Sequence, residues 1–583
     1  MAQKVKKICS SFGVNTYRWP NSRDAAEQRM IAIKAHIMDA DRLLAAQRGF
    51  MTEAVQTLIE RPRRGASSLL EEWRLFCLKE KGIYVQLNLF EGRTNLRANC
   101  WYPAAEEDQI RALLIQCSAR SSGAMLVSDR HPPRKKPPTH IRINEFTTAT
   151  QTLINLYGFP RYQEINPMPL SLVTFPFLFG VMYGDVGHGT LLFLFGLCLI
   201  WKADHVKSVS LLYNGRYMIT MMGFFGIYAG LMYNDCFSVG LDLFGSRWLG
   251  TETEDSGRKI LRFEPQFDSQ NMGGAGPYPF GLDPAWHGAS NELVYVNSLK
   301  MKISVVLGVV QMTTGLVLRF MNAKHEANLI DFCCECVPMM VFMLCFFGFM
   351  DYMILYKWVT AMDNPPSIIN SLIAMGMWQR DPAPMFGDSL PKQLMLLTVL
   401  TVPWMLIPKP LILYLRMKAA HGPGGFGAAG HEIGRAESLS DDEEKLESDD
   451  EESEEHGISD IVIHQVIETI EYVLGTVSHT ASYLRLWALS LAHQQLSFVF
   501  FQKTIQNGMA APFPLNVIGI YITFGIWFGI TLGVLMGMDV MECVLHVLRL
   551  HWIEFQSKFY KADGYLFFPY RHRDICDDTE SGF

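Results

Sequence analysis

The segment SYLRLWALSLAH, residues 482–493, contains a single arginine, Arg485, inside a long apolar stretch from about residue 458 to residue 505. A charge at the centre of a bilayer costs about 2.5–3.5 kcal/mol on insertion scales, so such a residue usually faces a partner charge or a water-filled path. The segment therefore predicts a membrane helix and favours ion translocation as the function. A structural ion pair that joins two helices is the alternative interpretation for Arg485.

Three other polar residues share the face of Arg485 if residues 458–507 form one helix. At 100° per residue, Glu471, Ser478, Arg485 and His493 fall within a stripe about 80° wide and about 33 Å long. This length matches the thickness of a bilayer core. The pattern predicts a polar track along an apolar helix. Taken alone, His493 would more often be a hydrogen-bonded packing residue.

The next apolar segment, about residues 514–550, carries a second set of ionisable side chains. Asp539 and His546 are seven residues apart and share a helix face, as do Glu542 and Arg549. We expect helix packing to bring these carboxylates toward the polar track. Glu542, His546 and Arg549 also lie near the end of the segment, where charged side chains commonly extend toward the polar interface without any further role.

A permanent positive charge suits ion transport for a chemical reason. Arginine stays charged at any physiological pH. Beside a carboxylate on a moving partner, it favours the ionised form, so that the carboxylate releases its proton. The neighbouring Glu, Ser, His and Asp groups would then line two water paths that open to opposite faces of the membrane. The pattern predicts two half-channels between which a partner subunit carries the ion.

Hydropathy predicts eight spans in a membrane domain that covers residues 166–583. The first two are short and meet at GDVGHG, residues 184–189, where Asp185 either contributes to the ion path or caps the second helix. The last two exceed the ~20 residues needed to cross a membrane, so we expect tilt, a kink or projection beyond the bilayer. The predicted spans are residues 170–184, 187–202, 215–233, 300–319, 334–357, 391–415, 458–507 and 514–550.

The distribution of Lys and Arg predicts the orientation of these spans. Connections 2–3, 4–5 and 6–7 and the tail after residue 552 are basic, whereas the turn at residues 507–514 has no basic residue. By the positive-inside rule, both termini are expected to be cytosolic. The same rule places the loop at about 420–457 in the cytosol and the loop at about 234–299 in the lumen.

The formal net charge of −7 comes from one tract within that cytosolic loop. Residues 437–456, ESLSDDEEKLESDDEESEEH, hold 12 acidic residues and one lysine, and the remainder of the chain has 50 basic against 46 acidic residues. Such a segment cannot bury enough apolar surface to fold. We expect a disordered, solvated loop with serines open to phosphorylation.

Residues 1–165 are predicted to form a cytosolic N-terminal domain. The pattern indicates a long helix over 22–60, a second helix over 68–80, an alternating strand over 82–90 and a helix over 104–118. With strand-like segments at 96–102 and 124–127, these make a small α/β lobe. Residues 129–138, DRHPPRKKPP, form a basic linker that we interpret as a solvated hinge.

Several functions are disfavoured by what the chain lacks. It has neither a G-x-x-x-x-G-K-[ST] nor a G-x-G-x-x-G motif, so no nucleotide cofactor is predicted and the energy for pumping would enter through another subunit. Cys333, Cys334 and Cys336 have no histidine at zinc-finger spacing nearby, so no metal site is predicted. Nucleic acid is not expected as a partner.

One long segment resembles a known family. Residues 464–502, HQVIETIEYVLGTVSHTASYLRLWALSLAHQQLSFVFFQ, are similar to the signature of subunit a, the large membrane stator subunit of eukaryotic vacuolar-type proton ATPases. Residues 73–90, 137–167, 174–189 and 548–552 agree with the same family, in order along the chain. The resemblance implies a mostly α fold, in which a partial α/β cytosolic domain with long helices precedes eight spans, the last two long and tilted.

The resemblance also implies roles for individual residues. Arg485 matches the essential arginine that faces the proteolipid ring, Glu471 and His493 match residues that line the channel, and Arg549 matches a second functional arginine. A further position departs from the pattern: where this chain has Asp539, the family usually has a glutamate.

The remaining implications concern Asp185, the partners and the location. Asp185 matches an aspartate of the family's first hairpin. The expected partners are the proteolipid c-ring and the lipid bilayer, with the peripheral stalks and the cytosolic ATPase sector reached through the N-terminal domain. The expected location is the membrane of acidic organelles, and the subunit itself hydrolyses no ATP. Family members begin with a longer cytosolic domain, so this chain is expected to start within it.

Two other functions remain open from the sequence. A stand-alone transporter or channel would move ions without a ring, although no inverted repeat relates the two halves of the chain. A non-transporting membrane scaffold would not need Arg485 for acidification.

Overall fold

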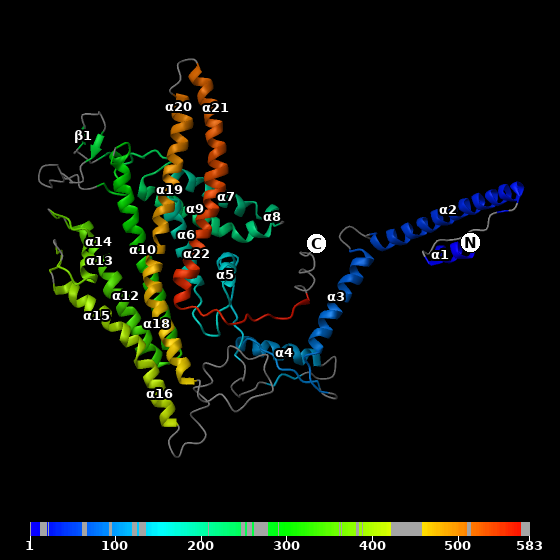
Figure 1. Ribbon diagram of the computed structural model, residues 1–583, viewed down its shortest axis with the longest axis horizontal. Coiled ribbons are helices and arrows are strands. Elements are labelled where there is room, and N and C mark those ends of the chain that lie inside the picture. Colours follow the sequence, from blue (N-terminus) through cyan, green and yellow to red (C-terminus); the bar gives the residue numbers. More distant parts are fainter. Residues whose placement is uncertain are drawn as a thin grey trace. The chain divides into compact units, whose positions relative to one another are not determined.

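The chain is mostly helical and divides into two compact units, residues 1–131 with 568–583 and residues 132–567. Figure 1 shows the helices in chain order. The computed structural model describes residues 2–11, 20, 22–60, 67–92, 96–118, 125–127, 136–207, 209–246, 251–253, 259–261, 278–289, 291–360, 362, 364–380, 384–387, 389–420, 457–509 and 515–572.

The first unit contains the long helix that the sequence predicts. Helix α2 spans Arg23–Ile59, and its N-cap is Ser22, whose hydroxyl accepts a hydrogen bond from the backbone N–H of Ala25 at 3.3 Å. A serine at this position satisfies one of the free N–H groups of the first turn. The predicted helix over 22–60 is therefore confirmed. The other helices of this unit are α1 Ala2–Ser11, α3 Leu69–Leu87, η1 Ala104–Glu106 and α4 Glu107–Ser118.

The strand predicted over residues 82–90 is wrong, because helix α3 continues to Leu87. The alternating apolar side chains that suggested a strand include Val85, which is 53% exposed. A helix pairs its backbone groups locally, whereas a strand needs a neighbouring strand. Residues 96–102 contribute one bridge, between Glu91 and Arg97, and residues 125–127 lie in no strand. The α/β lobe is thus not found in the described part of this unit, and most of the linker at 129–138 lies outside it.

The second unit is built from helices, with one small hairpin of strands β1 and β2. Helices η3, η4, η5, η6 and η7 are π-helical, and η2 and η8 are 3₁₀ turns. The elements are α5 Thr148–Asn155, α6 Met168–Tyr183, α7 Val186–Trp201, α8 Ala203–Val206, α9 Ser210–Tyr233, β1 Thr251–Thr253, β2 Lys259–Leu261, η2 Pro284–Trp286, α10 Glu292–His325, α11 Leu329–Asp331, η3 Phe332–Cys336, α12 Val337–Met343, η4 Leu344–Gly348, α13 Phe349–Val359, α14 Ile368–Gly376, α15 Ser389–Leu406, α16 Pro408–Ala420, α18 Gly457–Ser482, α19 Leu484–Phe501, η5 Gln502–Gln506, α20 Asn507–Met509, α21 Leu515–Ile530, η6 Thr531–Asp539, α22 Val540–Arg549, η7 Leu550–Phe555 and η8 Gln556–Lys558.

Among the residues that the structure describes, four helical stretches are long and apolar enough to cross a membrane: Glu292–His325, Leu329–Val359, Ser389–Arg416 and Val517–Lys558. They coincide with four of the eight predicted spans. Helices α6 and α7 are apolar but shorter, and they match the first two predicted spans. The remaining two predictions fall on α9 and on α18–α20. The count of eight stays a prediction, as does the orientation, and the acidic tract at 437–456 lies outside the described residues.

The start of the second unit at residue 132 includes a segment that the sequence places in the N-terminal domain. Thr139 donates its backbone N–H to the carbonyl of Tyr565 at 2.9 Å. The guanidinium of Arg161 forms a bidentate ion pair with the carboxylate of Asp563. Helix α5 packs against α6 and α9. Residues 136–165 thus pack with the apolar helices and with the chain beyond residue 558, and their assignment to a cytosolic domain stays a prediction.

Helices α6, α7 and α9 pack closely because glycines lie at their contacts. A Cβ atom on Gly230 of α9 would come within 2.3 Å of the backbone nitrogen of Val186, at the start of α7. Small residues of this kind let helix backbones approach one another. The close approach brings the end of α9 against the turn that carries Asp185.

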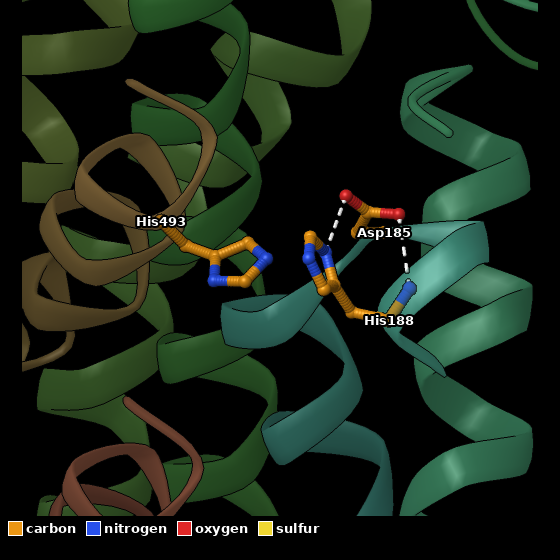
Figure 2. Close-up of side chains that lie close together, drawn as sticks. All are labelled: Asp185, His188 and His493. Carbon is orange, nitrogen blue, oxygen red and sulfur yellow. Dashed lines mark hydrogen bonds and ion pairs between the residues drawn. The ribbon is translucent and has the colours of Figure 1, made fainter. Parts of the chain in front are cut away.

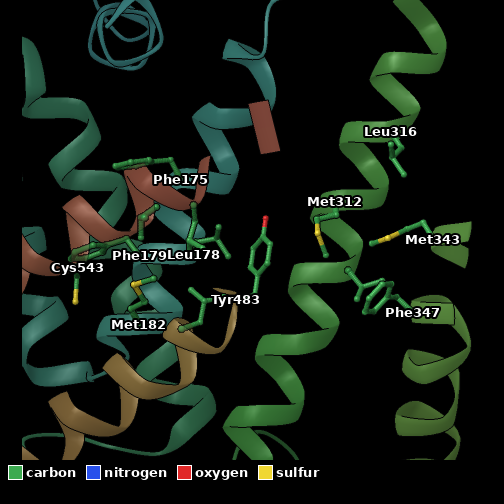
Figure 3. Packing of buried hydrophobic residues seen from close by; sticks show 14 of the residues in the cluster. Phe175, Leu178, Phe179, Met182, Met312, Leu316, Met343, Phe347, Tyr483 and Cys543 are labelled. Carbon is green, nitrogen blue, oxygen red and sulfur yellow. The ribbon is translucent and has the colours of Figure 1, made fainter. Parts of the chain in front are cut away.

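The apolar core joins these helices to α10, α19 and α22 (Figure 3). Tyr483, between α18 and α19, is fully buried, and its ring lies where a Cβ on Gly308 of α10 would be 2.5 Å away. The helix from residue 457 is interrupted at this tyrosine. The carbonyl of Tyr483 accepts the backbone N–H of Leu486 at 3.1 Å, an i+3 bond that tightens the turn. The span predicted over 458–507 is therefore divided at Tyr483 into α18 and α19 and is not one continuous helix.

An ion-pair network links five helical segments of the second unit. Arg319 of α10 contacts Glu335 of η3, and its Nη2 lies 2.8 Å from Oε1 of Glu468 on α18. Lys409 of α16 has its Nζ 3.1 Å from Oε2 of Glu335 and 3.3 Å from Oδ1 of Asp331. The side chain of Glu335 is only 5% exposed and is shared by both cations. This carboxylate therefore holds α10, η3 and α16 together.

Replacing Glu335 with alanine is expected to lower the thermal unfolding midpoint of the purified complex. Removing one partner of a buried ion pair costs about 3–5 kcal/mol, and we expect the lower end because Arg319 and Lys409 each keep a second carboxylate. The control is Asp204→Ala, which removes an exposed pair with Lys207. Equal midpoints for Glu335→Ala and the parent protein would show that the network contributes nothing to stability.

Candidate functional site

His493 lies at the centre of a buried polar cluster. Its Nδ1 is 2.5 Å from Oδ2 of Asp539, and the His493 side chain is 2% exposed. The ring also packs against Tyr183 of α6, with 4.5 Å between centroids. Asp539 is the last residue of the π-helical segment η6, and such segments are frequent at functional sites. The expectation that helix packing brings a carboxylate of the last span to the polar track is confirmed for Asp539.

Asp185 is the N-cap of helix α7. This is one of the two roles that the sequence suggested for it. Its Oδ1 accepts the backbone N–H groups of Gly187 at 2.7 Å and of Phe237 at 3.2 Å. Its Oδ2 lies 2.8 Å from Nδ1 of His188. Both Asp185 and His188 are fully buried. A part for Asp185 in an ion path stays a prediction.

His188 is a member of this cluster that the sequence interpretation missed. Figure 2 shows its ring between the Asp185 carboxylate and the ring of His493. The ring centroids of His188 and His493 are 5.2 Å apart. The i, i+3 spacing of Asp185 and His188 at a predicted helix start was the available signal. Among the described residues, Asp185, His188 and His493 are the one group whose donor atoms could hold a metal ion, all lying within 4.8 Å of one another.

A second pair of buried charges lies beside the cluster. The Nζ atom of Lys300 on α10 donates to Oε1 of Gln494 at 2.8 Å and lies over the ring of Tyr233 at 4.5 Å. Asp235, just beyond the end of α9, is 2% exposed. Burial, reinforced by the negative charge of Asp185, raises the pKa of Asp235 to about 7. Burial at this end of the cluster therefore favours the neutral form of the Asp235 carboxyl group.

Arg485 is half-buried and has no ion-pair partner among the residues that the structure describes. Its Nη1 atom is buried and lacks a hydrogen-bond partner there. Glu554 of η7, which is 1% exposed, lies within electrostatic range of Arg485 and Arg549. The Oε2 atom of Glu554 is likewise buried without a hydrogen-bond partner. The alternative of a structural ion pair for Arg485 finds no partner in the described part of the chain.

The other predicted residues lie at the surface of this unit. Glu471 and Ser478 are exposed on α18, and Arg549 is exposed on α22. Glu542 and His546 form an exposed pair with 3.6 Å between Oε1 and Nε2. The polar track thus runs from an exposed carboxylate, past a half-buried arginine, to a buried histidine. Among the predicted residues that the structure describes, direct contacts join His493 to Asp539 and His546 to Glu542.

Large apolar side chains surround Glu471 and Ser478 on α18. Their exposed fractions exceed one half, although the helix belongs to the apolar unit. These residues are Ile467, Ile470, Leu474 and Val477. A face of this composition suits lipid or an apolar partner helix rather than water.

Comparison with known proteins identifies the family. The sequence model of the V-type ATPase 116 kDa subunit family matches residues 1–572. The chain belongs to this family. The resemblance drawn from residues 464–502 is therefore confirmed.

Curated members of the V-type ATPase 116 kDa subunit family align over nearly the whole chain. The "Vacuolar proton translocating ATPase 100 kDa subunit" of Dictyostelium discoideum is 36% identical over 100% of this chain and 70% of its own length. The human "V-type proton ATPase 116 kDa subunit a 4" is 34% identical over 99% of this chain and 72% of its own length. For the mouse "V-type proton ATPase 116 kDa subunit a 1" the corresponding values are 35%, 99% and 71%.

Proposed function

We propose that this chain is the proton-path stator subunit in the membrane sector of a rotary, ATP-driven proton pump. It provides two half-channels and a fixed arginine, Arg485, that deprotonates carboxylates of a proteolipid ring. ATP hydrolysis takes place on other subunits. Family membership supports the pump, and the unpaired state of Arg485 is the observation that carries the mechanism.

A half-buried guanidinium whose buried Nη1 atom has no partner among the described residues is costly, which argues for a partner on another chain. An unsatisfied buried charged donor costs more than the ~1–3 kcal/mol of a neutral one. Arginine pairs best with a carboxylate, whose two oxygens match its planar donors. Arg485 is half-buried and follows directly on the exposed α18 face. A membrane-embedded carboxylate of a moving ring would satisfy it.

The polar residues on either side of Arg485 support two separate paths. Glu471 and Ser478 precede it and are exposed. His493 and Asp539 follow it in a buried cluster with Asp185. Glu471 on α18 and His493 on α19 are 22 residues apart, about 33 Å at a helical rise of 1.5 Å per residue, so the two groups would open toward opposite faces. With cytosolic termini, Glu471 lies nearer the cytosol and His493 nearer the lumen.

The remaining predicted residues complete these paths and contacts. Glu542, His546 and Arg549 lie on α22 at the surface that would meet the ring, along with the apolar face of α18. The N-terminal unit would contact the peripheral stalks and the cytosolic ATPase sector. The proposed location is the membrane of an acidic organelle.

A reconstitution experiment distinguishes this proposal from a stand-alone transporter. Proteoliposomes that contain the complete complex should acidify on addition of ATP, because ring carboxylates carry protons past Arg485. Liposomes that contain this chain alone should show no proton flux above that of empty liposomes under an imposed pH gradient. Flux through the chain alone would contradict the need for a ring, and the fluorescence of a trapped pH indicator reports both results.

A further inference from the structure

Two buried histidines each have a ring nitrogen for which the proposed proton path gives no binding partner. Nε2 of His188 and Nε2 of His493 are both buried, and neither has a hydrogen-bond partner among the described residues. The two side chains are 0% and 2% exposed. Figure 2 shows a ring nitrogen of His493 pointing toward the His188 ring. An unsatisfied polar atom in such a place calls for a ligand.

The carboxylates behind the rings determine which nitrogen is free to bind. Asp185 accepts from Nδ1 of His188 at 2.8 Å, and Asp539 accepts from Nδ1 of His493 at 2.5 Å. A carboxylate accepts hydrogen bonds, so each neutral ring carries its proton on Nδ1 and a lone pair on Nε2. Two lone pairs in one buried space repel each other unless a cation lies between them.

This arrangement is the one that proteins use to hold a metal with histidine. A histidine that binds a metal through one nitrogen usually donates its other N–H to a carboxylate, which fixes the tautomer and the ring orientation. Here the arrangement occurs twice, from α7 and from α19. The two aspartates also supply two negative charges, which balance a divalent ion in a buried site.

We propose that His188 and His493 form a binding site for Zn²⁺ through their Nε2 atoms, with Asp185 and Asp539 as the residues that orient the rings. Imidazole nitrogens and carboxylate oxygens suit Zn²⁺, which accepts water at its remaining positions. Zn–N bonds of about 2.0–2.1 Å require the nitrogens to lie about 3.3 Å apart. One possible ligand atom from each of Asp185, His188 and His493 lies within 4.8 Å of the other two, so the cluster is compact enough for a single ion.

Occupation of this site has a consequence that rests on the proposed function. An ion on Nε2 of His493 removes the lone pair that would accept a proton, and it sits beside the Asp539 carboxylate. Zn²⁺ would therefore block the lumenal half-channel. Binding of Zn²⁺ and inhibition of proton transport are measured in two separate experiments.

The binding measurement compares the intact complex with matched variants. The complex is stripped with a chelator, dialysed against ⁶⁵Zn²⁺ and assayed for bound ion per complex. His188→Gln and His493→Gln should each lose the same single equivalent, whereas His205→Gln, an exposed histidine of α8, should lose none. Size-exclusion chromatography confirms that each variant is assembled. An unchanged Zn²⁺ equivalent in assembled His188→Gln and His493→Gln overturns the site and favours a shared proton between the rings.

The transport measurement uses ATP-driven acidification by parent and His188→Gln vesicles at increasing Zn²⁺. The parent should be inhibited, and the Zn²⁺ concentration for half-inhibition should rise at least about tenfold in the variant, in line with the effect of losing part of a metal site. If one equivalent binds but acidification is insensitive to Zn²⁺, the metal site stands and the assignment of His493 to the proton path is overturned. If His205→Gln also lost both Zn²⁺ binding and inhibition by Zn²⁺, the proposed site would be overturned.

Discussion

Arg485→Gln is expected to abolish ATP-driven proton transport by the assembled complex, to below about 1% of the parent rate. A charge pair at 4 Å contributes about 4 kcal/mol at an effective dielectric constant of 20, which corresponds to about three pKa units of the facing carboxylate. Without the guanidinium, a ring carboxylate in an apolar environment stays protonated and does not release its proton. Acidification of vesicles, followed by quenching of a pH-sensitive dye, measures the loss.

Assembly should survive this substitution because Arg485 joins no other described residue by an ion pair. Glutamine also removes a charge whose insertion is itself costly. Arg485→Lys keeps the positive charge but loses the planar fork of donors, so it should retain no more than about a tenth of the activity. Arg42→Gln, on the exposed face of α2, is the matched control and should pump normally.

One outcome would decide against the proposal, and another would transfer the test to Arg485→Lys. Acidification by Arg485→Gln at half the parent rate or more would favour the non-transporting scaffold. Failure of Arg485→Gln to assemble would show that the residue contributes to structure, and the activity of assembled Arg485→Lys would then carry the test. Subunit content after affinity purification separates these cases.

Asp539→Asn is expected to reduce proton transport at least tenfold, the second largest effect. The carboxylate of Asp539 orients the ring of His493 through a hydrogen bond, and a charge-assisted hydrogen bond is about twice as strong as a neutral one. Asparagine can accept the hydrogen bond but carries no charge, so a proton that moves through this cluster would lose a neighbouring negative charge. The initial rate of acidification at saturating ATP measures the effect.

Asp539→Glu tests whether charge or side-chain length matters at this position. Glutamate keeps the charge and is the residue expected from the family pattern, so this variant should retain most of the parent activity. Glu107→Gln, which breaks an exposed pair on α4, controls for loss of a carboxylate elsewhere. If Asp539→Asn pumps like the parent, the contact with His493 has no part in transport.

The local pattern of apolar and polar residues predicted most of the helices, but it failed where an apolar stretch could form either a helix or a strand. The residues around Ser22 carry both a cap and an amphipathic pattern, and helix α2 begins and ends within one residue of the prediction. Residues 82–90 alternate like a strand, yet they lie next to a strong helix, and α3 extends through Leu87 because its hydrogen bonds need no partner segment. The break at Tyr483 depends on packing against Gly308, which is 175 residues away in the chain and invisible to a local pattern.

The candidate site divides in the same way. Charged residues in apolar stretches are rare enough that Arg485, Glu471 and Asp539 could be identified from their positions alone. The contacts between these residues could not be predicted from the sequence. His493 meets Asp539 because α19 packs near η6, and His188 joins them because α7 begins beside that contact.

The amino-acid sequence was sufficient to identify the family, the helical class and the charged residues in an apolar environment. The reason is that the free energy of solvation depends on the residue type and on its neighbours in the sequence. The pairing of His493 with Asp539, the union of His188 with that pair and the absence of an intrachain ion pair for Arg485 in the described residues required the three-dimensional arrangement. These features depend on contacts between segments that lie tens to hundreds of residues apart, and such contacts are decided by the packing of whole helices.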